Sequence, residues 1–175
     1  MPINKVRDGK AVIGTMLRAL RNPAIVPMAA NAGLDFLFVD SEHGAYSLNQ
    51  VADLALAARS HGLGLFVRVP ELSRAWVSGV LDNGASGVMV PMIETVEQAR
   101  LLAGWAKFPP LGERGLSALG PHTNYQMPSD LSGHMAEHND RTLSIAQIET
   151  VRGSEASGAI AAVAGIDALL VGPHD

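Results

Sequence analysis

The chain contains no cysteine and no cluster of positive charge, and these absences exclude several classes of protein. Without a single Cys in 175 residues, a disulfide framework, a thiol nucleophile and a cysteine metal site are all excluded. The 13 Lys and Arg form no run and the net charge is -4, which argues against nucleic acid as a partner. No apolar stretch reaches the roughly 20 residues that span a bilayer, and the N-terminus is too polar for a signal peptide. We therefore expect a cytoplasmic protein that does not bind a membrane.

What the chain does contain is a high share of apolar residues. Hydrophobic residues make up 47% of it and charged residues only 17%, against about 25% charged in a typical soluble domain. A parallel sheet covered on both faces explains this balance, because its strands are buried on both sides. The length predicts a single domain, residues 1–175.

Strand-like and helix-like segments alternate along the chain with short connections. Seven candidate strands occur in this order: 11–17, 36–39, 64–69, 87–90, 114–118, 143–148 and 168–171. Two of the intervening helices are predicted to begin with capping boxes, Ser47 with Gln50 and Thr95 with Gln98. Such alternation predicts βα units and a parallel sheet, either doubly wound or closed into a barrel.

The strand ends favour the barrel. The chain has no G-x-G-x-x-G and no P-loop, which a doubly wound nucleotide-binding fold would show. Acids, His and Arg follow the strands instead, and in a (β/α)8 TIM barrel these ends form the active-site face. Because a complete barrel takes roughly 250 residues, we expect a barrel that ends after its seventh strand and lacks the last helix, strand and helix.

One buried strand ends in a group of ionisable residues. Residues 36–39 are all apolar, and Asp40, Glu42 and His43 follow directly. A carboxylate three residues before an imidazole can fix its tautomer and raise its basicity. The alternative is a polar loop that follows a core strand and has no catalytic role.

Other strand ends carry groups that would complement this one. Arg68 ends the third candidate strand, Gln147 and Glu149 the sixth, and Asp175 the seventh. Two neighbouring carboxylates repel unless a proton or a cation lies between them, so Glu149 and Asp175 predict a site for Mg²⁺ or Mn²⁺. Arg68 could then stabilise an oxyanion while His43, oriented by Asp40, moves a proton. Each residue alone also has a structural explanation, such as a helix-start acid for Glu149 or a surface ion pair for Arg68.

The motifs at these positions resemble those of a known family. Residues 38–44, 67–69, 90–92, 109–115, 146–150 and 171–175 are similar, in order and spacing, to the HpcH/HpaI-type class II (metal-dependent) pyruvate aldolases. The resemblance implies a (β/α)8 barrel and a homo-oligomer, commonly a hexamer. It also implies the reversible cleavage of a 4-hydroxy-2-oxo acid or 2-keto-3-deoxy sugar acid into pyruvate and an aldehyde, through a metal-bound pyruvate enolate.

The same resemblance implies roles for individual residues. Glu149 and Asp175 match the ligands of a divalent ion, Mg²⁺ or Mn²⁺ with Co²⁺ as an alternative, and His43 with Asp40 matches the acid/base pair. Arg68 matches the arginine that stabilises the enolate. The substrate-binding positions are Arg68, Gln147, Gly172, Pro173, His174 and Asp175.

Other functions stay open at this point. The lysines are Lys5, Lys10 and Lys107, none at the end of a candidate strand, which disfavours a Schiff-base aldolase. A citryl- or malyl-CoA-type lyase would use similar enolate chemistry, and a non-catalytic fragment would need a complementary segment. His134 and His138 have a spacing that can bind zinc, although we expect a solvated helix face there.

Overall fold

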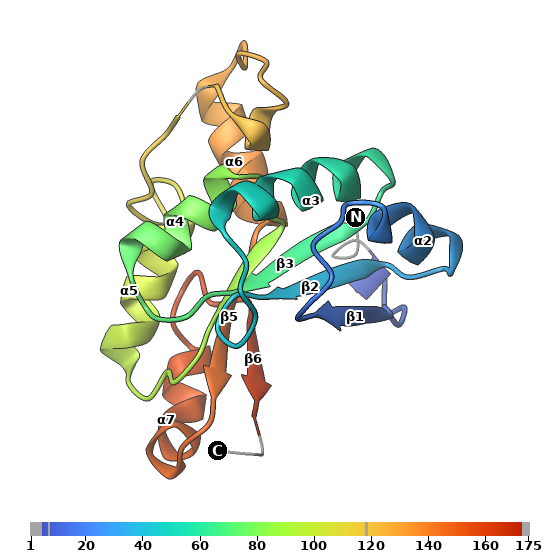
Figure 1. The fold of residues 1–175 in the computed structure, drawn as a ribbon. Helices are drawn as coiled ribbons and strands as arrows, with labels where there is room; N and C mark the ends of the chain where they lie inside the picture. The colour runs from blue at the N-terminus through green and yellow to red at the C-terminus, as the bar shows by residue number, and fades with distance from the viewer. Residues whose placement is uncertain (1–4, 7, 118, 173–175) are drawn as a thin grey trace.

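The strands form one parallel sheet in which neighbours in sequence are neighbours in space. The computed structural model describes residues 5, 6, 8–117 and 119–172. The strands lie in the order β1 (Gly14–Leu17), β2 (Phe36–Asp40), β3 (Gly64–Arg68), β4 (Gly87–Val90), β5 (Leu143–Ile148) and β6 (Ala168–Val171), as Figure 1 shows. The helices are α2 (Ile25–Asn31), α3 (Leu48–Ser60), α4 (Arg74–Asp82), α5 (Val96–Ala106), α6 (Leu131–Arg141) and α7 (Val151–Ala161), with a 3-10 turn η1 (Pro121–Thr123).

Local sequence signals set where the central helices begin. Both predicted capping boxes are confirmed: Ser47 accepts from the backbone N–H of Gln50 at the start of α3, and Thr95 accepts from that of Gln98 at the start of α5. In each case the glutamine side chain bonds back to the cap, so that otherwise unpaired backbone donors are satisfied. These caps therefore fix the residues at which the loops after β2 and β4 end and the helices α3 and α5 begin.

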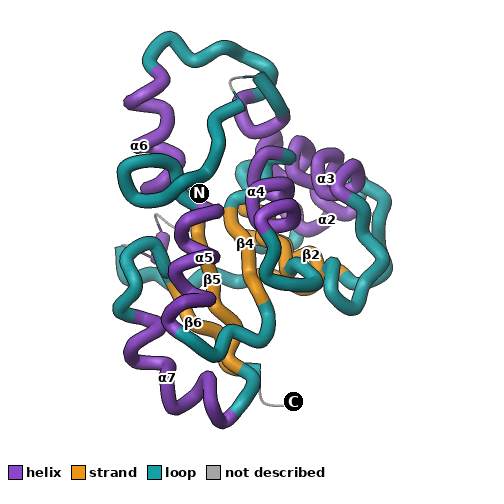
Figure 2. The backbone as a smooth tube through the Cα atoms, turned by 90° about the vertical axis from the view of Figure 1, so that its left-hand side faces the viewer, coloured by secondary structure: helices purple, strands orange, loops and turns teal. Residues whose placement is uncertain are grey.

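Successive side chains along each strand point to opposite faces of the sheet, and both faces are apolar. On the outer face, Leu37 and Val39 of β2 pack with Leu65 of β3 in the main core. The helices complete that core, with α3 lying on β3 and α4 on β4, and with α5 on β5, as Figure 2 shows. On the inner face, Phe38 and Phe66 form a smaller cluster with Met89 and Ile145. This two-sided burial explains the apolar strands of the sequence.

The predicted TIM barrel is wrong: the sheet is an open half-barrel. Six strands occur among the described residues, and their order leaves β1 and β6 as the two edge strands of the sheet. The expected strand over 114–118 does not form in its described part, 114–117. Instead β4 pairs directly with β5, Gly87 opposite Leu143, and Arg114 turns inward to Asp82 at the end of α4, with Nη2 2.6 Å from Oδ1. There is therefore no position for an intervening strand, and Ala168–Val171 is the sixth strand, not the seventh.

The sheet has two distinct ends because all its strands are parallel. The carboxyl ends of the strands together form what we call the carboxyl edge of the sheet, where Asp40, Arg68 and Gln147 lie. Helix α6 lies beyond the amino ends of the strands: in Figure 1 the head of the β5 arrow, which marks the carboxyl end, points away from α6. Within the described part of the chain, no helix combines the length and the apolar character needed to cross a membrane.

Candidate active site

Strand alternation places three of the predicted site residues on the inner face. Asp40 lies two residues after Phe38 and Arg68 two residues after Phe66, and both phenylalanines belong to the inner apolar cluster. Side chains at i and i+2 of a strand point to the same face, so Asp40 and Arg68 extend that cluster at its carboxyl edge. Gln147 follows the same rule on β5. The strand register itself pairs Asp40 with Arg68.

Asp40 and Arg68 form a buried, bidentate ion pair. Arg68 Nη2 donates to Asp40 Oδ2 at 2.7 Å and Arg68 Nε donates to Oδ1 at 3.0 Å. The backbone N–H groups of Glu42 and His43 also donate to Oδ1. Burial alone would raise the pKa of the Asp40 carboxyl, but these four hydrogen bonds and the charge of Arg68 outweigh it and hold the pKa below its ordinary value. Asp40 is therefore an anion that fixes the guanidinium in place.

Glu42 is a second carboxylate that shares Arg68. Its Oε2 lies 3.2 Å from Arg68 Nε but, although buried, accepts no hydrogen bond. Burial is the main cause that raises the pKa of the Glu42 carboxyl; Glu149 and Asp40 add to it and Arg68 opposes it. For Arg68, burial would lower the pKa, and the three neighbouring carboxylates Asp40, Glu42 and Glu149 raise it instead. The site thus has more negative than positive charge around one guanidinium.

Gln147 and Glu149 meet close to Gly172. The Gln147 side-chain amide donates to Glu149 Oε1, and the backbone N–H of Met92 donates to Oε2 at 2.9 Å. Met92 has a φ of 56°, a left-handed conformation that is uncommon outside glycine and is often found at functional sites. A Cβ on Gly172 would lie 2.8 Å from Glu149 Cγ and 3.2 Å from Gln147 Nε2. Glycine is therefore the residue that lets the backbone approach these two side chains.

His43 lies at the rim of the site. Its side chain is 55% exposed, and Nε2 is 3.8 Å from Oε2 of Glu42. Asp40 receives the backbone N–H of His43, while its two carboxylate oxygens also bind Arg68. The acid that lies near the imidazole ring here is Glu42. The expected orientation of the ring by Asp40 stays a prediction.

One contributor was missed by the sequence reasoning. Arg18 Nε lies 3.3 Å from Asp40 Oδ2, and the Arg18 side chain is 60% exposed. Arg18 directly follows β1, so the strand-end rule that selected Arg68 would have found it. It adds a second guanidinium to the same carboxylate from the neighbouring strand.

The described residues leave room for a ligand and offer oxygen donors. A groove of about 230 Å³ is lined by Gly14, Thr15, Met16, Phe36, Phe38, Arg68, Met89, Gln147 and Leu170. The buried amide oxygen of Gln147 accepts no hydrogen bond. Gln147, Glu42 and Glu149 thus offer amide and carboxylate oxygens near one another, and oxygen ligands suit a hard divalent ion better than zinc.

The expected second metal ligand and much of the expected carboxylate-binding backbone are not placed. Pro173, His174 and Asp175 lie outside the described residues. Within the described ranges, no group of three or more His, Cys, Asp or Glu side chains is positioned to hold a metal ion. Glu149 is thus the one predicted metal ligand with a defined position, and its chemistry fits such an ion.

Comparisons with known proteins agree on one family. The model of the family "HpcH/HpaI aldolase/citrate lyase" matches residues 15–175. A 4-hydroxy-2-oxovalerate aldolase of Novosphingobium aromaticivorans is 39% identical over 99% of this chain and 66% of its own. The crystal structure of an HpcH/HpaI aldolase from Desulfitobacterium hafniense DCB-2 matches with a TM-score of 0.91 and 40% identity, over 98% of this chain and 65% of that one.

A further solved structure carries a different activity in its title. The citrate synthase SbnG matches with a TM-score of 0.84 and 28% identity, over 97% of this chain and 64% of its own. In each of these three comparisons the chain spans slightly less than two thirds of the relative's length.

Proposed function

Because the chain belongs to the HpcH/HpaI aldolase/citrate lyase family, we propose that its fold and inner-face site serve a class II pyruvate aldolase. The reaction is the reversible cleavage of a 4-hydroxy-2-oxo acid into pyruvate and an aldehyde. The substrates are small molecules, a 2-oxo acid and an aldehyde. The observation that carries the proposal is the convergence of Arg68, Gln147, Glu149 and Gly172 at the carboxyl edge of the sheet.

Cleavage needs a place for the charge that forms on pyruvate. A base takes the proton of the C4 hydroxyl and the C3–C4 bond breaks, which releases the aldehyde and leaves the pyruvate enolate; a proton added to C3 then gives pyruvate. Arg68 is held rigidly by Asp40, so its free donors are fixed in advance toward the groove. Preorganised donors of this kind stabilise developing oxyanions. In this proposal Arg68 binds the enolate oxygen.

Two further roles are assigned to protein groups. His43 is solvent-accessible at the rim beside Glu42, where an imidazole can exchange protons with substrate and water; we assign it the acid/base role. The amide of Gln147 and the backbone at Gly172 lie together, and these groups, with Pro173 and His174, are proposed to contact the 2-oxo acid.

A divalent ion, Mg²⁺ or Mn²⁺ with Co²⁺ as an alternative, is proposed as the cofactor, with Glu149 and Asp175 as its protein ligands. When bound, such an ion acts as a Lewis acid toward the oxygens of the 2-oxo acid. The surplus of carboxylates around Arg68 supports a cation at this position. We further propose that the chain functions as a homo-oligomer.

Pyruvate release tests the proposal directly. The chain is incubated with 4-hydroxy-2-oxovalerate and Mn²⁺ or Mg²⁺, and pyruvate is followed through NADH oxidation by lactate dehydrogenase. We expect pyruvate to form with either ion, no release after EDTA treatment, and recovery when the ion is added back. Pyruvate formation that persists unchanged in EDTA would contradict a class II mechanism.

Two other functions are favoured by specific observations. The likeness to a citrate synthase favours a citryl- or malyl-CoA-type lyase, in which the enolate is that of acetyl-CoA; release of acetyl-CoA from citryl-CoA or malyl-CoA is the test. The length comparison and the exposed β6 edge, where Val171 is 72% exposed, favour a non-catalytic piece that requires a complementary segment. An inert chain that becomes active when extended by about 75 residues, the length a complete barrel needs, would select the latter.

A further inference from the structure

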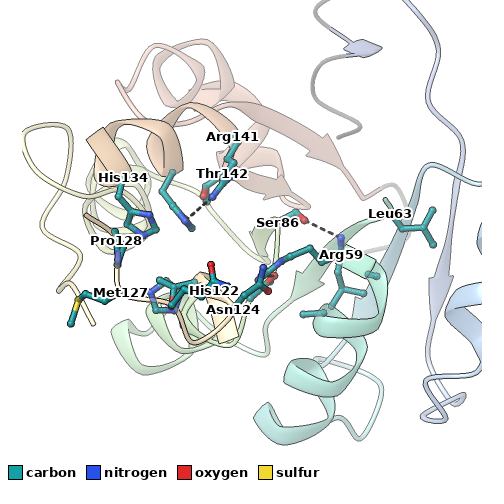
Figure 3. Close-up of a pocket in the computed structure, with 18 of the residues that line it drawn as sticks. Arg59, Leu63, Ser86, His122, Asn124, Met127, Pro128, His134, Arg141 and Thr142 are labelled. Carbon is teal, nitrogen blue, oxygen red and sulfur yellow. Dashed lines mark hydrogen bonds between the residues drawn. The ribbon is translucent and has the colours of Figure 1, made fainter. Parts of the chain in front are cut away.

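A second cavity lies at the amino ends of the strands, at the opposite end of the sheet from the candidate active site. It has a volume of about 460 Å³ and is shown in Figure 3. Four of the residues that line it are Leu63 just before β3, Leu65 at the start of β3, Ser86 just before β4 and Thr142 just before β5. All four lie at the amino ends of their strands, so this cavity is separated from Arg68 and Gln147 by the length of the strands. The proposed aldolase chemistry makes no use of it.

Two arginines approach the cavity from different helices. Arg59, in the last turn of α3, donates through Nη1 to the carbonyl of Pro121 at 2.6 Å and to the side chain of Asn124. Arg141, at the end of α6, donates to Glu137 at 2.8 Å and contacts Nε2 of His138 at 2.9 Å. A guanidinium has five donors, more than these contacts use. Figure 3 shows both arginine side chains at the cavity.

Three imidazoles form another wall. The rings of His134 and His138 are 4.3 Å apart between centroids, and His122 lies 6.3 Å from His134 and 5.9 Å from His138. His122 is fixed by the carbonyls of Asp82 and Ser117. By contrast, Nε2 of His134 is buried and has no hydrogen-bond partner. His138 is itself buried, so the solvated helix face expected here is wrong for this residue.

The charged side chains that line the cavity, Arg59 and Arg141, are both cations. No Asp or Glu occurs among its lining residues; of the nearby acids, Glu137 pairs with Arg141 and Asp82 with Arg114. Burial is the main cause that lowers the pKa of His134, and the charges of His122 and Arg141 lower it further. Burial and then the charge of Arg141 also lower the pKa of Arg59. The two guanidinium groups therefore repel one another, and an anion between them would relieve this repulsion.

We propose that this cavity binds a small organic phosphate, with Arg59, Arg141 and His134 as its recognition groups. A planar carboxylate is satisfied by one guanidinium in a bidentate contact, whereas a phosphate group accepts hydrogen bonds from several directions. Here the donors come from separate walls on α3 and α6. The volume exceeds what a bare phosphate fills and lies in the range of small-molecule sites, about 300–1,000 Å³.

Calorimetric titration with pyrophosphate tests the site in the absence of divalent ions and at constant ionic strength set with chloride. We expect saturable binding with a dissociation constant of about 1 mM or lower. Arg141→Gln should weaken it roughly tenfold, because a charge-assisted hydrogen bond is lost. The matched control is Arg100→Gln on α5, whose side chain is exposed and pairs with Glu97; its affinity should equal that of the wild type.

Two further experiments distinguish binding in this cavity from binding at the active site and from the effect of a folding defect. A folded Arg68→Gln variant should retain pyrophosphate binding; if the folded variant loses binding, the anion occupies the active-site end of the sheet and the proposal is overturned. If Arg141→Gln does not fold, the imidazole resonances of His134 in the wild type are followed by NMR. Saturable shifts of these resonances support the proposal. Unmoved resonances, absence of saturable binding, or equal affinity of a folded Arg141→Gln variant overturns it.

Discussion

Asp40 at the end of β2 accepts two hydrogen bonds from one edge of the Arg68 guanidinium at the end of β3, with Nη2 2.7 Å from Oδ2 and Nε 3.0 Å from Oδ1. The pair is buried and joins adjacent strands. It therefore has two consequences: the arginine is held in one orientation for a substrate, and the carboxylate depends on the arginine for its stability as an anion.

Replacement of Arg68 should separate catalysis from metal binding. In Arg68→Ala we expect proton exchange at the pyruvate methyl group to be lost while Mn²⁺ still binds, because the variant keeps Glu149. The change also leaves Asp40 as a buried, less compensated charge, and breaking such a pair costs about 3–5 kcal/mol. Proton exchange is measured by NMR in deuterated water and stability by urea unfolding. Exchange at the wild-type rate in a folded Arg68→Ala variant would remove the assigned role.

Replacement of Glu149 should remove both properties. Glu149→Gln keeps the side-chain size near Gly172 but lacks the charge that a divalent ion requires. We expect Mn²⁺ affinity, measured by calorimetry, and pyruvate proton exchange to fall together by at least about tenfold. Glu97→Gln is the matched control, since Glu97 is exposed on α5. A Glu149→Gln variant with wild-type Mn²⁺ affinity would show that the ion is bound elsewhere.

Borohydride should trap no imine. Lys107 is buried, with Nζ 2.7 Å from Asp167 Oδ2 and 3.1 Å from the carbonyl of Asn139, and Lys5 pairs with Asp35 just before β2. Both lie away from the edge that carries Arg68. Borohydride reduction of the chain with pyruvate should therefore leave the intact mass unchanged. A mass increase that corresponds to one reduced pyruvate adduct would contradict the metal-dependent mechanism.

The free energy of unfolding should decrease as the pH is lowered, partly because of His138. Burial is the main cause, followed by the charge of Arg141, that lowers its pKa from 6.5 to about 3. Between these values the unfolded chain binds a proton that the folded chain does not, so the free energy of unfolding decreases as the pH falls, by up to about 1.4 kcal/mol per pH unit from this group.

His138→Gln tests this coupling. Urea unfolding at pH 7 and pH 5 should show a smaller loss of stability in the variant than in the wild type, because Gln does not titrate. His61→Gln serves as the control, since His61 is exposed at the end of α3. An identical loss in the wild type and His138→Gln would refute the assignment.

Local features of this fold follow from residues that lie close together along the chain. Capping boxes at Ser47 and Thr95 act within four residues, and apolar runs such as Phe36–Val39 need no distant partner to be recognised. Because parallel strands present their carboxyl ends at one edge, the same local reading also gathered Asp40, Arg68 and Gln147 correctly on one side of the sheet.

Contacts between distant segments fixed the features that local patterns could not predict. That 114–117 forms no strand depended on Arg114 reaching Asp82 and on β4 pairing with β5. The partner of Asp40 was likewise decided between strands, as Arg68 lies 28 residues away, while His43 is its close neighbour in sequence. Local propensity carries no information on such competition, because the winning contact depends on geometry and burial that exist only once the sheet has formed.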